Sequence, residues 1–132
     1  MQTFLPVPNF SQTAKILDYK RLGKQRVEAF TILKVLNNKT IGWINHPIVK
    51  MWTNYKESLT LYMNTCIIEW INRGYKNNME IIQISNKIIM PKWLGDERLH
   101  SSHRANLLRK DFNYYSQFNW SEQPSNKYFW PI

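Results

Sequence analysis

The apolar residues between positions 48 and 70 form the pattern that most constrains how this chain can fold. Many of them are spaced three and four positions apart: Trp52, Tyr55, Leu59, Tyr62, Cys66 and Trp70. That spacing is typical of an amphipathic helix with one buried face. His46-Pro47 precedes the pattern and Arg73-Gly74 follows it, and proline and glycine are favoured at the start and just beyond the end of a helix. We therefore predict one helix from Pro47 to about Arg73.

Two further helices are predicted, one before this helix in the sequence and one after it. Ser11 is a candidate N-cap, and apolar residues recur at helical spacing from there to about Asn38. Asp96 is a second candidate N-cap, so a third helix should run from about Glu97 to Lys110. The sequence thus predicts an all-α domain of about three main helices with irregular connections, similar in size to an ordinary single domain.

The remaining segments are less regular. Polar residues at 37–40 predict the end of the first helix, and residues 75–90 fit either a short helix or a strand. Residues 112–118 should add another helical turn or two. Residues 128–132 are too apolar for a free tail and are expected to pack back on the domain. We expect residues 1–132 to form one domain.

The charge of the chain favours a polyanionic partner. It has 18 Lys and Arg against 9 Asp and Glu, a formal net charge of +9, and each phosphate that such a protein neutralises releases a condensed counterion. The single cysteine, Cys66, excludes an intrachain disulfide and fits a reducing compartment. No signal peptide or membrane span is recognisable. The expected location is therefore the cytoplasm, or the host cytoplasm for a viral protein.

The first polar cluster lies in the first predicted helix. Lys20, Lys24 and Glu28 stack in one row, a turn apart, with Arg21 beside them and Arg26 nearby. Amines beside a carboxylate can bind phosphates or carry out acid–base chemistry. The alternative is an exposed ion pair on a solvated helix face, worth about 0.3–0.5 kcal/mol.

The second polar cluster lies in the third predicted helix. His100 and His103 are three residues apart and share a face, which Arg104 and Lys110 extend. Contacts to phosphates or base edges are the favoured interpretation. A histidine pair can also bind zinc, but the chain lacks the usual zinc motifs, and we expect no metal and no cofactor. A plain surface helix is the remaining alternative. No P-loop, nucleophile-elbow or dinucleotide-binding motif is present.

Several stretches of the sequence resemble the pyrimidine-dimer DNA glycosylase (endonuclease V) superfamily. They are D-x-K-R-x-x-K-x-R-V-E at 18–28, H-P-x-x-x-M-W-x-x-Y at 46–55 and E-W-x-x-R-G-Y at 69–75. A fourth stretch, M-P-x-W-L-G-D-E-R-x-H-x-S-H-R-x-x-L-L-R-K-D at 90–111, closely resembles a small bacterial and viral branch of that superfamily.

This resemblance implies a helical domain that flips a base out of the DNA duplex. In the repair enzymes an N-terminal α-amine attacks C1′ of the sugar and forms an imine, and β-elimination then nicks the strand. A glutamate in the first helix stabilises the developing charge, and neighbouring arginines hold phosphates. An α-amine has a pKa near 8, so a useful fraction of it is neutral and nucleophilic at physiological pH.

Two positions of this chain differ from that pattern. The large side chain of Gln2 should prevent removal of Met1, so the α-amine is expected on Met1. Aligned without gaps, the catalytic glutamate of the family falls on Gly23. Glu28, more than one turn further on, is then the candidate carboxylate.

Two functions from different classes follow. The first is a DNA-binding, base-excision-type N-glycosylase acting on damaged or modified DNA, with AP-lyase activity and Met1 and Glu28 as catalytic residues. Lys20 or Lys24 is the alternative amine. The second is a non-catalytic nucleotide-binding protein on the same scaffold, which a virus could use to sequester a nucleotide or a cyclic nucleotide immune signal.

A third possibility is a nucleotide-cleaving enzyme with His100 or His103 as general acid or base. The expected partner is DNA or a free nucleotide and not a membrane; a homodimer stays open, because the apolar stripe could serve as a dimer seam. The residues predicted to bind nucleic acid or nucleotide are Lys20, Arg21, Lys24, Arg26, His46, Trp52, Tyr55, Trp93, His100, His103, Arg104 and Lys110.

Overall fold

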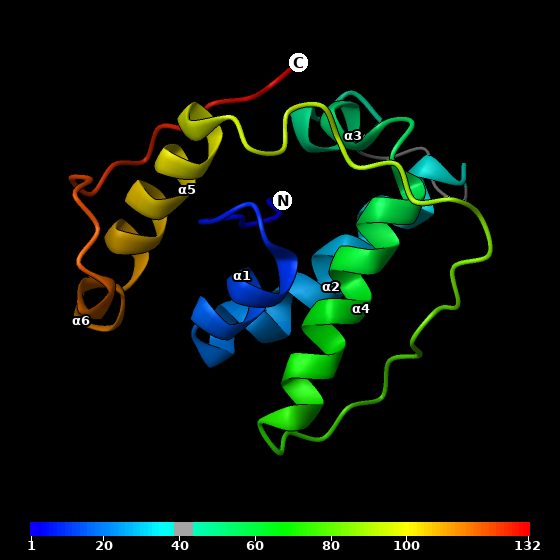
Figure 1. The fold of residues 1–132 in the computed structure, drawn as a ribbon, viewed down its shortest axis with the longest axis horizontal. Helices are drawn as coiled ribbons and strands as arrows, with labels where there is room; N and C mark the ends of the chain where they lie inside the picture. Colours follow the sequence, from blue (N-terminus) through cyan, green and yellow to red (C-terminus); the bar gives the residue numbers. More distant parts are fainter. Residues whose placement is uncertain (39–43) are drawn as a thin grey trace.

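The computed structural model describes residues 1–38 and 44–132, and these residues form helices and connections without strands. Three helices are long: α2 (Tyr19–Leu36), α4 (Lys56–Asn72) and α5 (Glu97–Lys110). The shorter ones are α1 (Phe10–Ile16), α3 (Pro47–Trp52) and α6 (Phe112–Tyr115), which continues into a 3₁₀ turn at Ser116–Phe118. The predicted all-α fold with about three main helices is confirmed (Figure 1).

The first predicted helix is in fact two helices, so that prediction is wrong in its continuity and in its cap. Asn9, not Ser11, caps α1, because its Oδ1 accepts a backbone hydrogen bond from the first turn. The helix stops at Leu17, whose carbonyl accepts a hydrogen bond from the Arg73 guanidinium at 2.7 Å. Asp18 then begins α2. The side chain of Arg73, the residue that follows α4, thus pairs carbonyls at the end of α1.

The second predicted helix is also interrupted. It is divided into α3 and α4 by residues 53–55, where Asn54 has a φ of 73°. Its start and end are as predicted. His46 caps α3 by accepting the N–H of Ile48 on Nδ1 at 3.0 Å, and Gly74, with a φ of 88°, follows the end of α4.

The third predicted helix is confirmed, with its N-cap: the Asp96 side chain accepts the N–H of Arg98 at 3.1 Å. The predicted turns at 112–118 are confirmed as well. Residues 75–90 are neither helix nor strand and run around the outside of the domain (Figure 1). The first long helix ends at Leu36, while Lys39 and Thr40 of its predicted stop lie outside the described residues.

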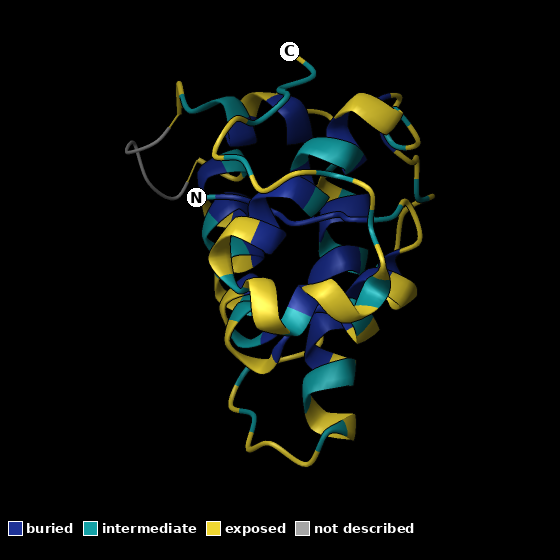
Figure 2. Ribbon diagram, turned by 90° about the vertical axis from the view of Figure 1, so that its left-hand side faces the viewer, coloured by how far each residue is buried: buried dark blue, intermediate teal, exposed yellow. Residues whose placement is uncertain are grey.

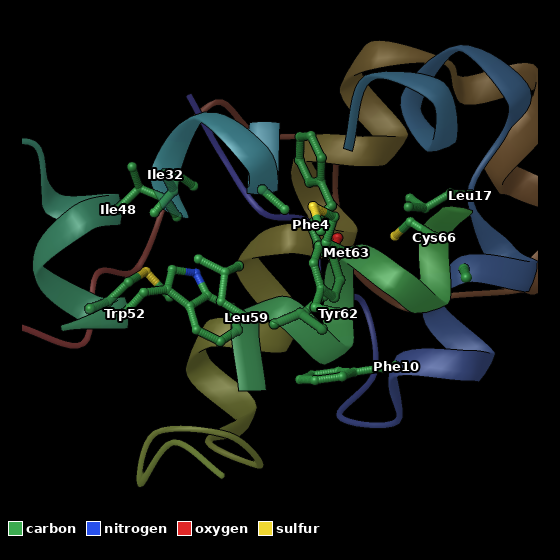
Figure 3. Packing of buried hydrophobic residues seen from close by; sticks show 14 of the residues in the cluster. Phe4, Phe10, Leu17, Ile32, Ile48, Trp52, Leu59, Tyr62, Met63 and Cys66 are labelled. Carbon is green, nitrogen blue, oxygen red and sulfur yellow. The ribbon is translucent and has the colours of Figure 1, made fainter. Parts of the chain in front are cut away.

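The core lies where α2 packs against α4, with α1 and α3 at its edges. Figure 3 shows its large side chains, among them Ile32, Trp52 and Tyr62, which are all fully buried. The predicted apolar stripe therefore packs inward. The C-terminal segment at 128–132 packs back on the domain, as predicted, and the N–H of Phe129 donates to Ser102 Oγ on α5 at 3.1 Å. Within the described ranges no helix is long and apolar enough to cross a membrane.

An extended segment, residues 1–6, occupies the middle of this helical fold. It lies between α5 on one side and the α2–α4 pair on the other (Figure 1). Residues 2–6 of this N-terminal segment are buried, as the dark blue strip of chain in Figure 2 shows. It has no β-sheet partner, so its backbone groups need side-chain partners.

Candidate active site

Side chains from α2 and α4 hold one side of the N-terminal segment. Gln25 accepts the N–H of Phe4 on Oε1 at 2.8 Å and donates its Nε2 to the Gln2 carbonyl at 3.0 Å. The Tyr62 hydroxyl donates to the Phe4 carbonyl at 2.7 Å. Gln25 is 2% exposed and Tyr62 is fully buried, so water does not compete for these bonds.

Side chains from α5 hold the other side. The N–H of Leu5 donates to Nδ1 of His103 at 2.9 Å, and Nδ1 of His100 lies 2.7 Å from the Leu5 carbonyl oxygen. Arg104 donates to the Pro6 carbonyl at 2.8 Å. The two histidines therefore bind both polar groups of one residue, much as a neighbouring β-strand would.

These bonds fix the protonation of both histidines. A carbonyl only accepts, so His100 carries its proton on Nδ1, and its Nε2 accepts the N–H of Gly95 at 2.9 Å. His103 accepts on Nδ1 and carries its proton on Nε2. Burial, helped by the nearby His100, lowers the pKa of His103 to about 3. Burial also lowers the pKa of His100, so both rings are neutral at physiological pH.

A pocket of about 1030 Å³ opens at the start of the N-terminal segment. Met1, Gln2 and Phe4 form part of its wall, with side chains from α2 and from the ends of α4 and α5. The predicted site residues that line it are Met1, Lys20, Arg21, Lys24, Glu28 and Lys110. The row Lys20, Lys24 and Glu28 therefore faces the pocket along α2, as one helical face should.

The pocket is cationic, and most of its ammonium groups are available. In the described part of the chain, Lys20, Lys24 and Lys110 form no ion pair. Burial lowers the pKa of Lys110, and the nearby Arg109, Arg21 and Lys24 lower it further. Cations from two distant parts of the sequence therefore meet here and can receive an anion.

The acidic groups of the pocket differ in their pairing. Asp18 pairs with Arg21 at 3.3 Å and accepts a hydrogen bond from the Tyr115 hydroxyl, and Asp111 caps α6. Glu28 is half-buried and has no ion pair or hydrogen bond from its side chain among the described residues. Glu28 is thus the carboxylate that remains available for chemistry.

The surroundings of Gly23 leave no room for a carboxylate at that position of α2. A Cβ at this position would lie 2.8 Å from Cζ3 of Trp70. The indole is held by a hydrogen bond from its Nε1 to the Lys76 carbonyl at 2.9 Å and by the Arg26 guanidinium, 4.3 Å above the ring. A glutamate at position 23 would therefore clash with a fixed indole.

Several predicted binding residues lie outside the pocket, each with a partner in the protein. Arg26 donates to the side chain of Asn77 at 2.8 Å. Trp93 is buried and donates to the Met51 carbonyl at 2.8 Å. The Tyr55 hydroxyl accepts the N–H of Lys92 at 3.4 Å.

The other residues in this group hold the scaffold. Trp52 is fully buried and donates to Thr3 Oγ1 at 3.0 Å, and His46 caps α3. His100, His103 and Arg104 hold the N-terminal segment from behind and do not line the pocket. For all eight residues, contact with nucleic acid stays a prediction.

Sequence reasoning missed Gln2, within the segment, and the two residues that support the segment from α2 and α4, Gln25 and Tyr62. One signal was present: Gln25 falls in the buried row of α2, between Leu22 and Ala29. A polar residue at a core position of a helix needs a buried partner. Its partner, the backbone at residues 2–4, is not apparent from helical periodicity.

The described residues contain no group of three or more His, Cys, Asp or Glu side chains that could hold a metal ion. Burial raises the pKa of Cys66 to about 12, which keeps this thiol protonated and unreactive.

Comparison with known proteins adds one finding. A family model described as pyrimidine dimer DNA glycosylase matches residues 1–83, well over half of the chain. No curated protein and no solved structure matches it.

Proposed function

Because the chain belongs to the pyrimidine dimer DNA glycosylase family, we propose that it is a DNA N-glycosylase that releases a base from damaged or modified DNA and then nicks the strand as an AP lyase. The observation that carries this proposal is the pocket, where Met1 and the unpaired Glu28 share one cationic hollow with Lys20, Lys24 and Lys110. A damaged nucleotide must leave the duplex to reach such a hollow.

The proposed nucleophile is the α-amine of Met1. Its lone pair attacks C1′ of the sugar, while the bond from C1′ to the base breaks and its electron pair leaves with the base. The base takes up a proton as the amine loses one. Glu28 stabilises the positive charge that develops on the sugar, since it is the pocket carboxylate without a partner in the described chain.

Strand cleavage follows from the same bond. The sugar ring opens as its oxygen takes a proton, leaving a protonated imine between the amine and C1′. Loss of a proton from C2′ forms a C2′–C3′ double bond and expels the 3′ phosphate. Water then hydrolyses the imine and frees the amine. Lys20, Arg21, Lys24 and Lys110 bind the phosphates on either side of the flipped nucleotide.

The direct test measures cleavage of the bond between C1′ and N1 in a duplex that contains a cyclobutane thymine dimer. The cut thymine stays joined to its neighbour through the cyclobutane ring, so its release is counted after ultraviolet light has reversed the dimer. Glu28→Gln should slow release by about 10²-fold or more, because the amide cannot stabilise a cationic sugar as a carboxylate does. Glu80→Gln is the matched control, since Glu80 is exposed and lies away from the pocket. Equal rates for the two variants would contradict the role of Glu28.

The second test traps the imine. Borohydride should reduce it to a stable adduct between the protein and a duplex with an abasic site, and peptide mapping then locates the amine. An adduct on Met1 supports the proposed nucleophile, and one on Lys20 or Lys24 replaces it. Absence of both base release and adduct, with a nucleotide bound tightly, would support the nucleotide-binding alternative, which uses the same pocket.

A further inference from the structure

Gln2 lies in the wall of the pocket and has a side-chain amide with an unused donor. The residue lines the pocket, and only 8% of it is exposed. Its Oε1 accepts the N–H of Thr3 at 2.9 Å, and its backbone carbonyl accepts from Gln25 at 3.0 Å. The bond to Thr3 fixes which way the amide is turned, because only the oxygen can accept.

The nitrogen of that amide has no partner. Gln2 Nε2 is buried and makes no hydrogen bond with any residue that the structure describes. Native proteins leave few buried donors unpaired. Nε2 of His103 is also unpaired and buried, but His103 does not line the pocket. Of these two unpaired donors, the one on Gln2 therefore belongs to a residue of the pocket wall.

The chemistry of the pocket narrows the choice of acceptor. The lysine ammonium groups of α2 and α5 in the pocket suit the charged oxygens of a phosphate. A neutral amide suits a neutral carbonyl oxygen. Thymine has two carbonyls, at C2 and C4, whereas adenine has none. The C2 carbonyl is bonded directly to N1, so its oxygen gains negative charge as the bond from C1′ to N1 breaks. A donor placed on such an oxygen binds the transition state more strongly than the ground state.

We propose that Nε2 of Gln2 donates a hydrogen bond to a carbonyl oxygen of the pyrimidine that the enzyme releases, and so favours pyrimidine as the leaving base. This inference rests on the proposed glycosylase function and adds a base-contacting residue to it. The bond that breaks joins C1′ and N1, its electron pair passes to the ring, and the amide stabilises that charge without transferring a proton.

The test separates base release from strand nicking. Gln2→Met removes the donor, nearly preserves side-chain length and keeps a large second residue, so Met1 is retained; the intact mass checks this. Cleavage of the bond from C1′ to N1 in the dimer duplex, counted as thymine freed after reversal of the dimer by ultraviolet light, should slow at least about tenfold. Nicking of a duplex with a preformed abasic site, which has no base to contact, should stay within about twofold of wild type. Gln12→Met, on the exposed face of α1, is the matched control.

Each outcome has one interpretation. Unchanged thymine release by Gln2→Met overturns this inference and leaves the proposed function standing. Equal loss of release and nicking also overturns it, because Gln2 would then act only by holding Met1. If the wild type cleaves the bond between sugar and base in no duplex, the proposed function falls and this inference falls with it.

Discussion

At the scale of single residues, His100 and His103 act through their neutral forms. A protonated His103 has no acceptor for the N–H of Leu5, and a protonated His100 has none for the N–H of Gly95. The attachment of the N-terminal segment, and of Met1 with it, therefore depends on both rings staying unprotonated. Because their pKa values are lowered in the folded protein, their contribution to the free energy of unfolding decreases as the pH falls.

We expect acid to loosen this attachment. His103 has a pKa of about 3 when folded, and an unfolded histidine has one of about 6.5, so the unfolded chain binds more protons between these values. The contribution of His103 to the free energy of unfolding is therefore complete above pH about 6.5. It is lost as the pH falls toward 3, by up to about 1.4 kcal/mol per pH unit.

His103→Gln tests this expectation by urea unfolding between pH 7.5 and 5. The glutamine oxygen can accept the N–H of Leu5 but does not titrate, so the free energy of unfolding should fall less steeply with acid than in the wild type. Other groups titrate alike in both proteins. Parallel curves would show that His103 does not carry the pH dependence.

Residue positions within one helix were predictable, but partners across the fold were not. The row of Lys20, Lys24 and Glu28 follows from the helical repeat alone, and α2 turns it toward the pocket. His103 belongs with Leu5, 98 residues away. The local sequence gives no sign of that pairing. The histidines were therefore predicted to contact a ligand, whereas in the structure they bind the backbone of Leu5.

At the scale of helices, the contact between Gly23 and Trp70 sets how closely α2 approaches α4. Alanine is favoured over glycine inside a helix by about 1 kcal/mol. The added Cβ would lie 2.8 Å from the indole, and such overpacking typically costs about 1–3 kcal/mol. We therefore expect Gly23→Ala to destabilise the protein despite its better helix propensity.

A double-mutant cycle with Trp70→Phe checks the cause. Phenylalanine lacks the outer indole atoms that the Cβ would meet, so Gly23→Ala should cost less, or stabilise, in the Trp70→Phe background. Thermal unfolding of the four proteins gives the coupling. The same cost in both backgrounds would mean that Trp70 is not what excludes a side chain at position 23.

Helix interruptions were the part of the secondary structure that periodicity could not predict. The apolar spacing continues from Trp52 through Tyr55 to Leu59, although residues 53–55 leave the helix. The break after Leu17 depends on Arg73, a residue from another helix. Caps with local partners, such as Asp96, were predictable because the bond spans two residues.

At the scale of the whole molecule, cations from α2 and α5 converge on one side. We expect Lys24→Ala with Lys110→Ala to weaken duplex binding and to reduce the slope of log affinity against log salt by about two, since each phosphate contact contributes about 0.9. Fluorescence anisotropy across a salt series measures both quantities.

The control variant for this prediction loses the same two positive charges, at positions outside the pocket. Lys87→Ala with Lys92→Ala removes two exposed lysines that do not line the pocket, so affinity and slope should stay closer to wild type. If both pairs reduce the slope equally, binding responds to net charge and not to the pocket.

The N-terminal segment also has a consequence for biosynthesis. Its partners on α5 are nearly a hundred residues further along the chain, beyond residues 1–83 that carry the family signature. A nascent chain on the ribosome can pair Phe4 with Gln25 early, but Leu5 must wait until His103 has been translated. The wall behind the pocket is therefore among the last parts of the protein to assemble, and a chain that stalls before α5 carries the signature without a finished site.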